Sequence, residues 1–149
     1  MLSVPVNPMP DGSLCLHAST VCLNDKALVI AGPSGSGKST LALRMISLGA
    51  DLVADDTTHL RGTPDHVTAH HPATMPPLIE VRGVGLLHAP HVTDQPVHGI
   101  LDLGTEEIER LPDLHHIELL GRDVTLLRKP ATPYIAEAMI HYLRFGRST

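Results

Sequence analysis

The sequence contains few aromatic residues, and its basic residues form no cluster. Of its 149 residues none is Trp, one is Phe and two are Tyr, so a core must be built from aliphatic side chains. Recognition of single-stranded nucleic acid by base stacking needs aromatic side chains and is therefore not expected. The net charge of −5 and the scattered 11 Lys and Arg residues provide no basic surface for a polyanion. We expect no nucleic-acid partner.

Cysteines are also scarce, and no apolar run approaches the length that crosses a membrane. Cys15 and Cys22 fall in strands predicted to be neighbours, where they can face one another, but two reduced thiols are the favoured interpretation. The first ten residues lack the basic start and the long apolar stretch of a secretory signal. These features predict a cytoplasmic protein without a membrane partner.

The pattern of apolar residues predicts one α/β domain over residues 1–149, with a mixed central sheet, flanking helices and an irregular lead-in at 1–12. A chain of this length typically folds as a single domain that buries about 70% of its unfolded surface. Alternating or continuous apolar runs predict strands at 13–17, 20–23, 27–31, 51–56, 57–61, 66–69, 78–82 and 97–103. Helices are predicted at 41–48, at 106–111 and from Thr132, as N-cap, to about Arg144.

The most informative segment is a glycine-rich loop, residues 32–39, between the buried strand 27–31 and the helix 41–48. It fits G-x-x-x-x-G-K-[ST], the P-loop motif that cradles the phosphates of a nucleoside triphosphate. Glycine permits positive φ, so successive backbone N–H groups can turn inward around an anion at the positive end of the helix. The predicted nucleotide-binding residues are Gly32, Pro33, Ser34, Gly35, Ser36, Gly37, Lys38, Ser39 and Thr40.

Two further pairs of charged residues indicate which reaction the bound nucleotide takes part in. Asp55 and Asp56 end an apolar strand, where one acid can contact Mg²⁺ or its waters while the other accepts the proton of an acceptor hydroxyl. Acids that cap a turn before Thr57 are the alternative interpretation. Glu80 and Arg82 stand two apart in a predicted strand and share a face. By spacing alone they are an exposed ion pair.

Together these motifs resemble, in order and spacing, the catalytic domain of the HPr serine kinase/phosphorylase family. The resemblance rests on His17, the glycine-rich loop, the segment 52–56 and, most distinctively, Ile79-Glu-Val-Arg-Gly-Val-Gly-Leu86. It implies a P-loop fold of the phosphoenolpyruvate carboxykinase-like type. It also implies a bacterial enzyme that uses ATP and Mg²⁺ to phosphorylate a serine of the carrier protein HPr, a step that many members reverse. Members form homo-oligomers, hexamers in this family.

The resemblance assigns a role to each matching residue. It places Lys38 at the β/γ-phosphates and makes the acid pair the source of the catalytic base, with Asp56 favoured. Arg82 is implied to neutralise charge in the transition state, while Arg110, within Glu109-Arg110-Leu111, is a fainter match to a catalytic arginine. The candidate catalytic residues are therefore His17, Lys38, Asp55, Asp56, Arg82 and Arg110, and the candidate metal ligands are Ser39, Asp55 and Glu80.

The sequence also departs from the family pattern. Full-length members carry an N-terminal domain of comparable size, so this chain is expected to be a minimal catalytic form. Where the family has a Pro-Gly-Arg loop associated with dephosphorylation, this chain has Arg128-Lys-Pro-Ala-Thr-Pro133, which puts phosphorylase activity in question. A module that senses ATP without transferring phosphate and a small-metabolite kinase remain the alternatives. The 11 histidines lack fixed metal-ligand spacing and are interpreted as loop residues.

Overall fold

The structure is a computed structural model that describes residues 1–73 and 77–148. Within them the chain forms one short and ten longer strands and two helices. The strands are β1 (Asn7–Pro8), β2 (Leu14–Leu23), β3 (Lys26–Ala31), β4 (Asp51–Ala54), β5 (Thr57–Gly62), β6 (Val67–His70), β7 (Leu78–Val81), β8 (Gly85–His88), β9 (Gln95–Glu106), β10 (His115–Leu119) and β11 (Arg122–Lys129). The helices are α1 (Lys38–Ser47) and α2 (Ile135–Phe145).

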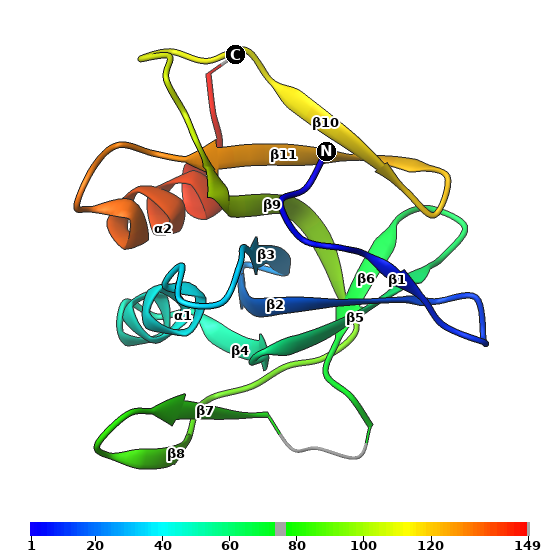
Figure 1. Ribbon diagram of the computed structural model, residues 1–149, viewed down its shortest axis with the longest axis horizontal. Helices are drawn as coiled ribbons and strands as arrows, with labels where there is room; N and C mark the ends of the chain where they lie inside the picture. Colours follow the sequence, from blue (N-terminus) through cyan, green and yellow to red (C-terminus); the bar gives the residue numbers. More distant parts are fainter. Residues whose placement is uncertain (74–76, 149) are drawn as a thin grey trace.

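A mixed sheet in the order β4-β2-β3-β9-β11-β10 forms the centre of the fold (Figure 1). Strands β3, β9 and β11 are parallel, whereas β2 runs antiparallel between β3 and β4. The first half of β2 pairs with β5, β5 pairs with β6, and the start of β9 pairs with β6. Since β3 pairs with both β9 and β2, the strands β2, β5, β6, β9 and β3 form a closed ring of pairings. The predicted α/β class with a mixed central sheet is confirmed.

Two aliphatic clusters fill the two faces of this sheet. Because side chains alternate along a strand, Leu28 and Ile30 of β3 belong to the cluster under α1 and α2, whereas Val29 and Ala31 belong to the opposite cluster. Both helices therefore cover the same face, as Figure 1 shows. Within the described residues, neither helix has the length and apolar character of a membrane-spanning segment.

The lead-in is tied to the sheet by a buried carboxylate. Asp102, 1% exposed in the second half of β9, accepts hydrogen bonds from the Ser3 backbone N (2.7 Å), the Ser3 Oγ (2.5 Å) and the Gly104 N (2.9 Å). Leu2, Val4 and Val6 pack on the cluster opposite the helices. Although residues 1–12 contain only the short β1, they cover part of the core.

Several predicted elements differ from the observed ones. The two short strands predicted at 13–17 and 20–23 are one continuous strand, β2. Its first half pairs with β1 and β5, and its second half pairs with β3 and β4. Cys15 and Cys22 therefore lie seven residues apart on one strand, roughly 23 Å along it, and both are free thiols. They cannot face one another.

The predicted helix at 106–111 is wrong. Strand β9 continues to Glu106, and the Glu107 N donates to the Lys129 O at 2.8 Å, so pairing with β11 competes successfully with local helix propensity. The predicted cap of the last helix is also wrong, because α2 begins at Ile135 with Tyr134 at the N-cap. The hairpin of β10 and β11 was not predicted.

Two histidines, the buried His70 and the partly buried His98, link stability to pH. Burial lowers the pKa of His98, and Lys26 lowers it further; burial also lowers the pKa of His70, although Asp94 opposes that effect. Below the ordinary histidine value of about 6.5, the unfolded chain binds protons that the folded chain does not. Stability is therefore expected to decline as the pH falls through that value.

We predict that His98→Phe, which retains a ring beside Tyr142, makes the decline below about pH 6.5 shallower. Urea unfolding at pH 8 and pH 5.5 measures the difference, and His66→Asn, at an exposed turn position, is the control for loss of an imidazole. Equal losses of stability in wild type and His98→Phe would contradict the prediction.

Candidate functional site

The glycine-rich loop connects the end of β3 to the start of α1 and leaves the helix N-terminus open. Gly35 and Gly37 have φ of 82° and 98°, values that L side chains rarely adopt. Gly37 is the N-cap, has no side-chain capping bond, and the first turn of α1 carries no acidic residue. The first N–H groups of a helix lack intrahelical partners, so this end presents donors and a positive dipole to an anion.

The packing beneath the loop also requires glycine. A Cβ on Gly32 would lie 2.6 Å from the Ser36 Oγ and 3.2 Å from the Leu103 Cβ. Among the described residues, the Ser36 Oγ is the buried side-chain polar atom that has no hydrogen-bond partner. A buried hydroxyl without a partner costs free energy, which a phosphate oxygen at the loop would recover. These residues fit a nucleoside triphosphate.

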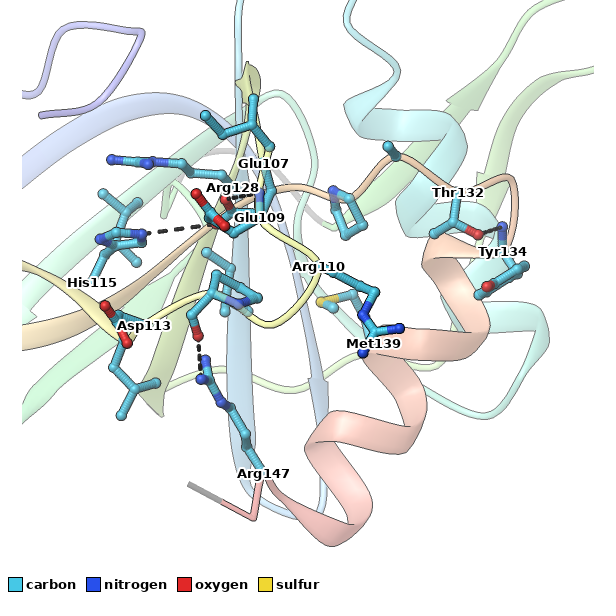
Figure 2. A pocket seen from close by; sticks show the side chains of 17 residues that line it. Glu107, Glu109, Arg110, Asp113, His115, Arg128, Thr132, Tyr134, Met139 and Arg147 are labelled. Carbon is cyan, nitrogen blue, oxygen red and sulfur yellow. Dashed lines mark hydrogen bonds and ion pairs between the residues drawn. The ribbon is translucent and has the colours of Figure 1, made fainter.

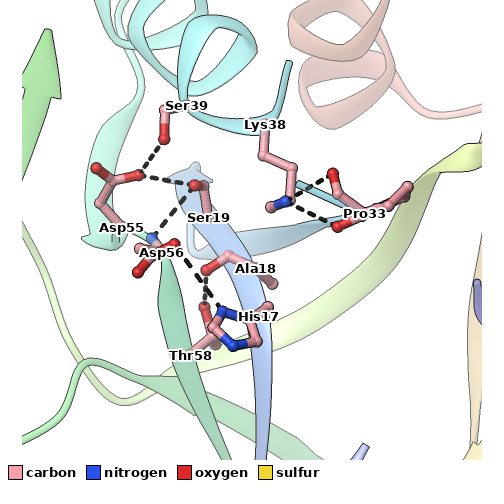
Figure 3. A network of polar contacts seen from close by, with 10 residues as sticks. His17, Ala18, Ser19, Pro33, Lys38, Ser39, Asp55, Asp56 and Thr58 are labelled. Carbon is pink, nitrogen blue, oxygen red and sulfur yellow. Dashed lines mark hydrogen bonds and ion pairs between the residues drawn. The ribbon is translucent and has the colours of Figure 1, made fainter. Parts of the chain in front are cut away.

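Lys38, the lysine of the motif, reaches back along the loop. Its Nζ donates to the Gly32 O at 2.7 Å and to the Pro33 O at 3.1 Å (Figure 3). These carbonyls hold the ammonium group at the start of the loop. A flexible lysine side chain can exchange such carbonyls for phosphate oxygens at little cost, because both are hydrogen-bond acceptors.

The carboxylate of Asp55 joins three elements, and Figure 3 shows its bonds to two of them, α1 and β2. Its Oδ1 accepts from the Ser39 Oγ of α1 at 2.8 Å and from the Ser19 Oγ of β2 at 2.7 Å. Its Oδ2 accepts from the Glu80 backbone N of β7 at 3.3 Å. Asp55 is therefore fixed beside the motif serine, the position expected of an acid that acts on Mg²⁺ or its waters.

Asp56, the next residue, is held differently and faces solvent. It has φ of 68°, and the Thr57 N donates across it to the Asp55 O at 2.8 Å, which closes a three-residue γ-turn. A γ-turn of positive φ is rare and strained. Its side chain is 79% exposed and lies 3.9 Å from the Nδ1 of His17, itself 73% exposed. The backbone therefore adopts a strained conformation at a residue whose carboxylate faces solvent.

Glu80 and Arg82 belong to the hairpin of β7 and β8, a separate two-stranded sheet that packs beside α1 through the buried Ile79. The backbone N–H of Glu80 donates a hydrogen bond to Asp55, and Glu80 itself is exposed. Arg82 follows two residues later, in the exposed turn at 82–84. The structure thus brings the backbone of Glu80 to Asp55 and places Arg82 at the tip of the same hairpin.

Arg110 is the candidate that the structure places elsewhere. It lies in the connection from β9 to β10 and lines a cavity of about 490 Å³ against α2, with Met139 and Arg147 nearby (Figure 2). The glycine-rich loop does not line this cavity. Arg110 is not assembled with Asp55 and Asp56.

The sequence analysis overlooked the hydroxyl groups that position the acids. Besides its bond to Asp55, the Ser19 Oγ accepts from the Asp56 N at 3.4 Å. Below it, the buried Thr20 and Thr58 share a hydrogen bond of 2.8 Å, and the Thr58 Oγ1 donates to the Ala18 O at 2.9 Å. The spacing of His17 and Ser19, two apart on one strand, was the signal that they share a face.

The donor set fits Mg²⁺ better than a metal that the protein alone would hold. No group of three or more His, Cys, Asp or Glu side chains in the described ranges is placed to bind a metal ion. Mg²⁺ usually keeps several waters and takes one or two carboxylates plus substrate phosphates. Asp55 and the Ser39 hydroxyl supply oxygens of this kind at the start of α1, and the backbone of Glu80 lies beside Asp55.

The comparisons with known proteins agree on one family. The profile of the HPr serine kinase C-terminal domain matches residues 12–95, more than half of the chain. A protein of Bordetella pertussis named HPr kinase/phosphorylase is 51% identical over 61 residues, covering 40% of this chain and 20% of that protein. One of the same name from Cupriavidus necator is 31% identical over 125 residues, covering 76% of this chain and 39% of the relative.

The fold has a solved counterpart. The structure of the Hpr(Ser) kinase/phosphatase from Coxiella burnetii superposes with a TM-score of 0.73 and 22% sequence identity, over 87% of this chain and 93% of that one. This α/β chain with its glycine-rich loop thus shares its architecture with a kinase/phosphatase structure. The chain belongs to the HPr serine kinase C-terminal domain family. It spans between 20% and 39% of the length of these curated relatives.

We predict that Asp56→Gly raises the free energy of unfolding by about 1 kcal/mol, because glycine adopts φ of 68° without strain. Asp25→Gly, at an exposed aspartate with φ of 59° in the turn between β2 and β3, should stabilise the chain similarly. Urea unfolding of the two variants measures both effects. An unchanged or lower stability of Asp56→Gly would show that the γ-turn stores no strain.

Proposed function

We propose that this chain is a Mg²⁺- and ATP-dependent protein kinase that phosphorylates a serine of an HPr-like phosphocarrier of the bacterial phosphotransferase system. Family membership and the names of the relatives support the carrier as acceptor. The observation that carries the proposal is the exposed carboxylate of Asp56, directly beside the acid that hydrogen-bonds to the motif serine.

We further propose the phosphoenolpyruvate carboxykinase-like type of P-loop fold, supported by the antiparallel β2 between β3 and β4.

The two acids support different steps of phosphoryl transfer. Asp55 already accepts three hydrogen bonds, so its oxygens are committed to the loop, to β2 and to β7. Asp56 has an exposed carboxylate that lies near the imidazole of His17, and it can approach an acceptor hydroxyl from solvent. We therefore assign Asp56 as the base that takes the serine proton, and Asp55 as the metal-side acid.

The remaining residues bind and orient the reactants. Mg²⁺·ATP supplies the transferable phosphoryl group and neutralises charge that develops on it. Lys38 and the N–H groups of the glycine-rich loop hold the phosphates, Ser39 and Glu80 offer oxygens to the metal, and Arg82 approaches from the β7–β8 hairpin. His17 orients the carboxylate of Asp56.

The proposal also covers the oligomeric state, the cellular location and the direction of phosphoryl transfer. We propose a homo-oligomer, as the resemblance implies, and a cytoplasmic location. We expect transfer to the carrier rather than dephosphorylation, because the segment 128–133 lacks the Pro-Gly-Arg sequence. In this structure that segment contains the last two residues of β11 and leads toward α2, and Arg128 lines the cavity of about 490 Å³ that Arg110 also lines.

We predict that Asp56→Asn lowers the rate of phosphoserine formation by at least about 100-fold, because it removes the general base, while the affinity for ATP changes less than about threefold. The assay incubates the purified chain with Mg²⁺, ATP and an HPr-type protein and locates the phosphate by mass spectrometry. Asp65→Asn, the same change at an exposed turn of the β5–β6 hairpin, is the matched control.

Two results would contradict the proposal. If wild type binds ATP but leaves no phosphoserine on any HPr-type protein, the chain is an ATP sensor. If Asp56→Asn transfers phosphate as fast as Asp65→Asn, the base is another group.

A further inference from the structure

A second cavity adjoins the glycine-rich loop on the side away from the acids. It has a volume of about 210 Å³. Its walls come from the loop, α1, the end of β9 and the segment that joins β11 to α2: Ser36, Gly37, Thr40, Leu41, Arg44, Leu103, Lys129, Pro133 and Ile135. In the strand order β4-β2-β3-β9-β11, the loop follows β3, with Asp55 on the β4 side and this cavity on the β9 and β11 side.

The walls combine apolar surface with positive charge. Leu103, Pro133 and Ile135 provide aliphatic surface, while Lys129 and Arg44 provide cations. Arg44 is held in place by an ion pair with Glu137 (3.6 Å) and by a hydrogen bond of 3.5 Å to the Pro133 O. An apolar cavity edged by cations suits a ligand with a flat apolar part and an attached anion.

The position of the cavity relative to the loop restricts what that ligand is. Ser36 and Gly37 line it and also belong to the glycine-rich loop, and the unpartnered Ser36 Oγ lies where the two meet. At the opposite edge of the loop, Asp55 and Asp56 define the end at which phosphate is transferred. A triphosphate on the loop with its terminal phosphate toward the acids would direct its other end toward this cavity.

We propose that this cavity, lined by Leu103, Lys129, Pro133 and Ile135 beside the loop, binds the base and ribose end of the nucleoside triphosphate. The proposal rests on the proposed function, since it takes a nucleoside triphosphate as the ligand of the glycine-rich loop. The volume is below the roughly 300 Å³ of an ordinary small-molecule site, which is consistent with a subsite for part of a ligand. The aliphatic walls contact the base, and Lys129 and Arg44 lie near the first phosphate.

The test compares Mg²⁺·ATP with Mg²⁺·tripolyphosphate, which has the phosphates but neither base nor ribose. Calorimetric titration of wild type should show that ATP binds at least about tenfold more tightly. Ile135→Ala should weaken ATP binding about tenfold and leave tripolyphosphate within about twofold, because it removes only apolar contact. Ile46→Ala is the matched control: it is also partly buried, packs on the same cluster and does not line the cavity.

Each other outcome has a distinct meaning. If wild type binds ATP no more tightly than tripolyphosphate, or if Ile135→Ala weakens both ligands equally, the base subsite is wrong while the phosphate site stands. If neither ligand binds to wild type, the proposed function fails with it. Should Ile135→Ala not fold, Ile135→Val removes one methylene and should produce a smaller loss confined to ATP.

Discussion

The site depends on the hydrogen bonds that one carboxylate accepts. Asp55 joins the start of α1, the middle of β2 and the start of the β7–β8 hairpin, which belong to three separate parts of the chain. Because a carboxylate only accepts, each of these groups must approach with a donor. The Ser39 and Ser19 hydroxyls and the Glu80 amide satisfy that requirement together. One carboxylate thus connects α1, β2 and β7, each of which carries another candidate residue.

Strain at Asp56 follows from that arrangement. Strands β4 and β5 both run antiparallel to β2, so the chain passes from one to the other in the same direction, and the bond from the Thr57 N to the Asp55 O places a tight kink at Asp56. In this kink Asp56 has φ of 68°. Aspartate tolerates such a conformation better than most residues but less well than glycine, so a carboxylate at this position is retained at the expense of stability. This is the pattern expected where chemistry, rather than packing, selects the residue.

Much of the fold could be predicted because its signals were local. The run at 27–31, the glycine-rich loop and the helix after it each carry their pattern within a few residues. The helix predicted at 106–111 was wrong because Glu106 and Glu107 are good helix formers whose backbone instead pairs with β11, a strand far along the chain. The hairpin of β10 and β11 was missed because its turn, Leu120-Gly121, lacks the Asn or Asp that marks such turns. The bonds of Ser19 to Asp55 were beyond local reasoning, since 36 residues separate them.

The register of β2 explains why residues from distant segments share one edge. Ala18 lies opposite Ala31, the last residue of β3, and Thr20 lies opposite Ala54, the last of β4. The residues that flank Ala18 therefore stand next to the point where the glycine-rich loop leaves β3 and where the acids leave β4. A shift of one residue in β2 would turn His17 and Ser19 to the other face, among aliphatic side chains and away from Asp55 and Asp56. The alternation that packs Leu16 and Ala18 into the core thus also fixes which side of β2 faces the phosphate loop.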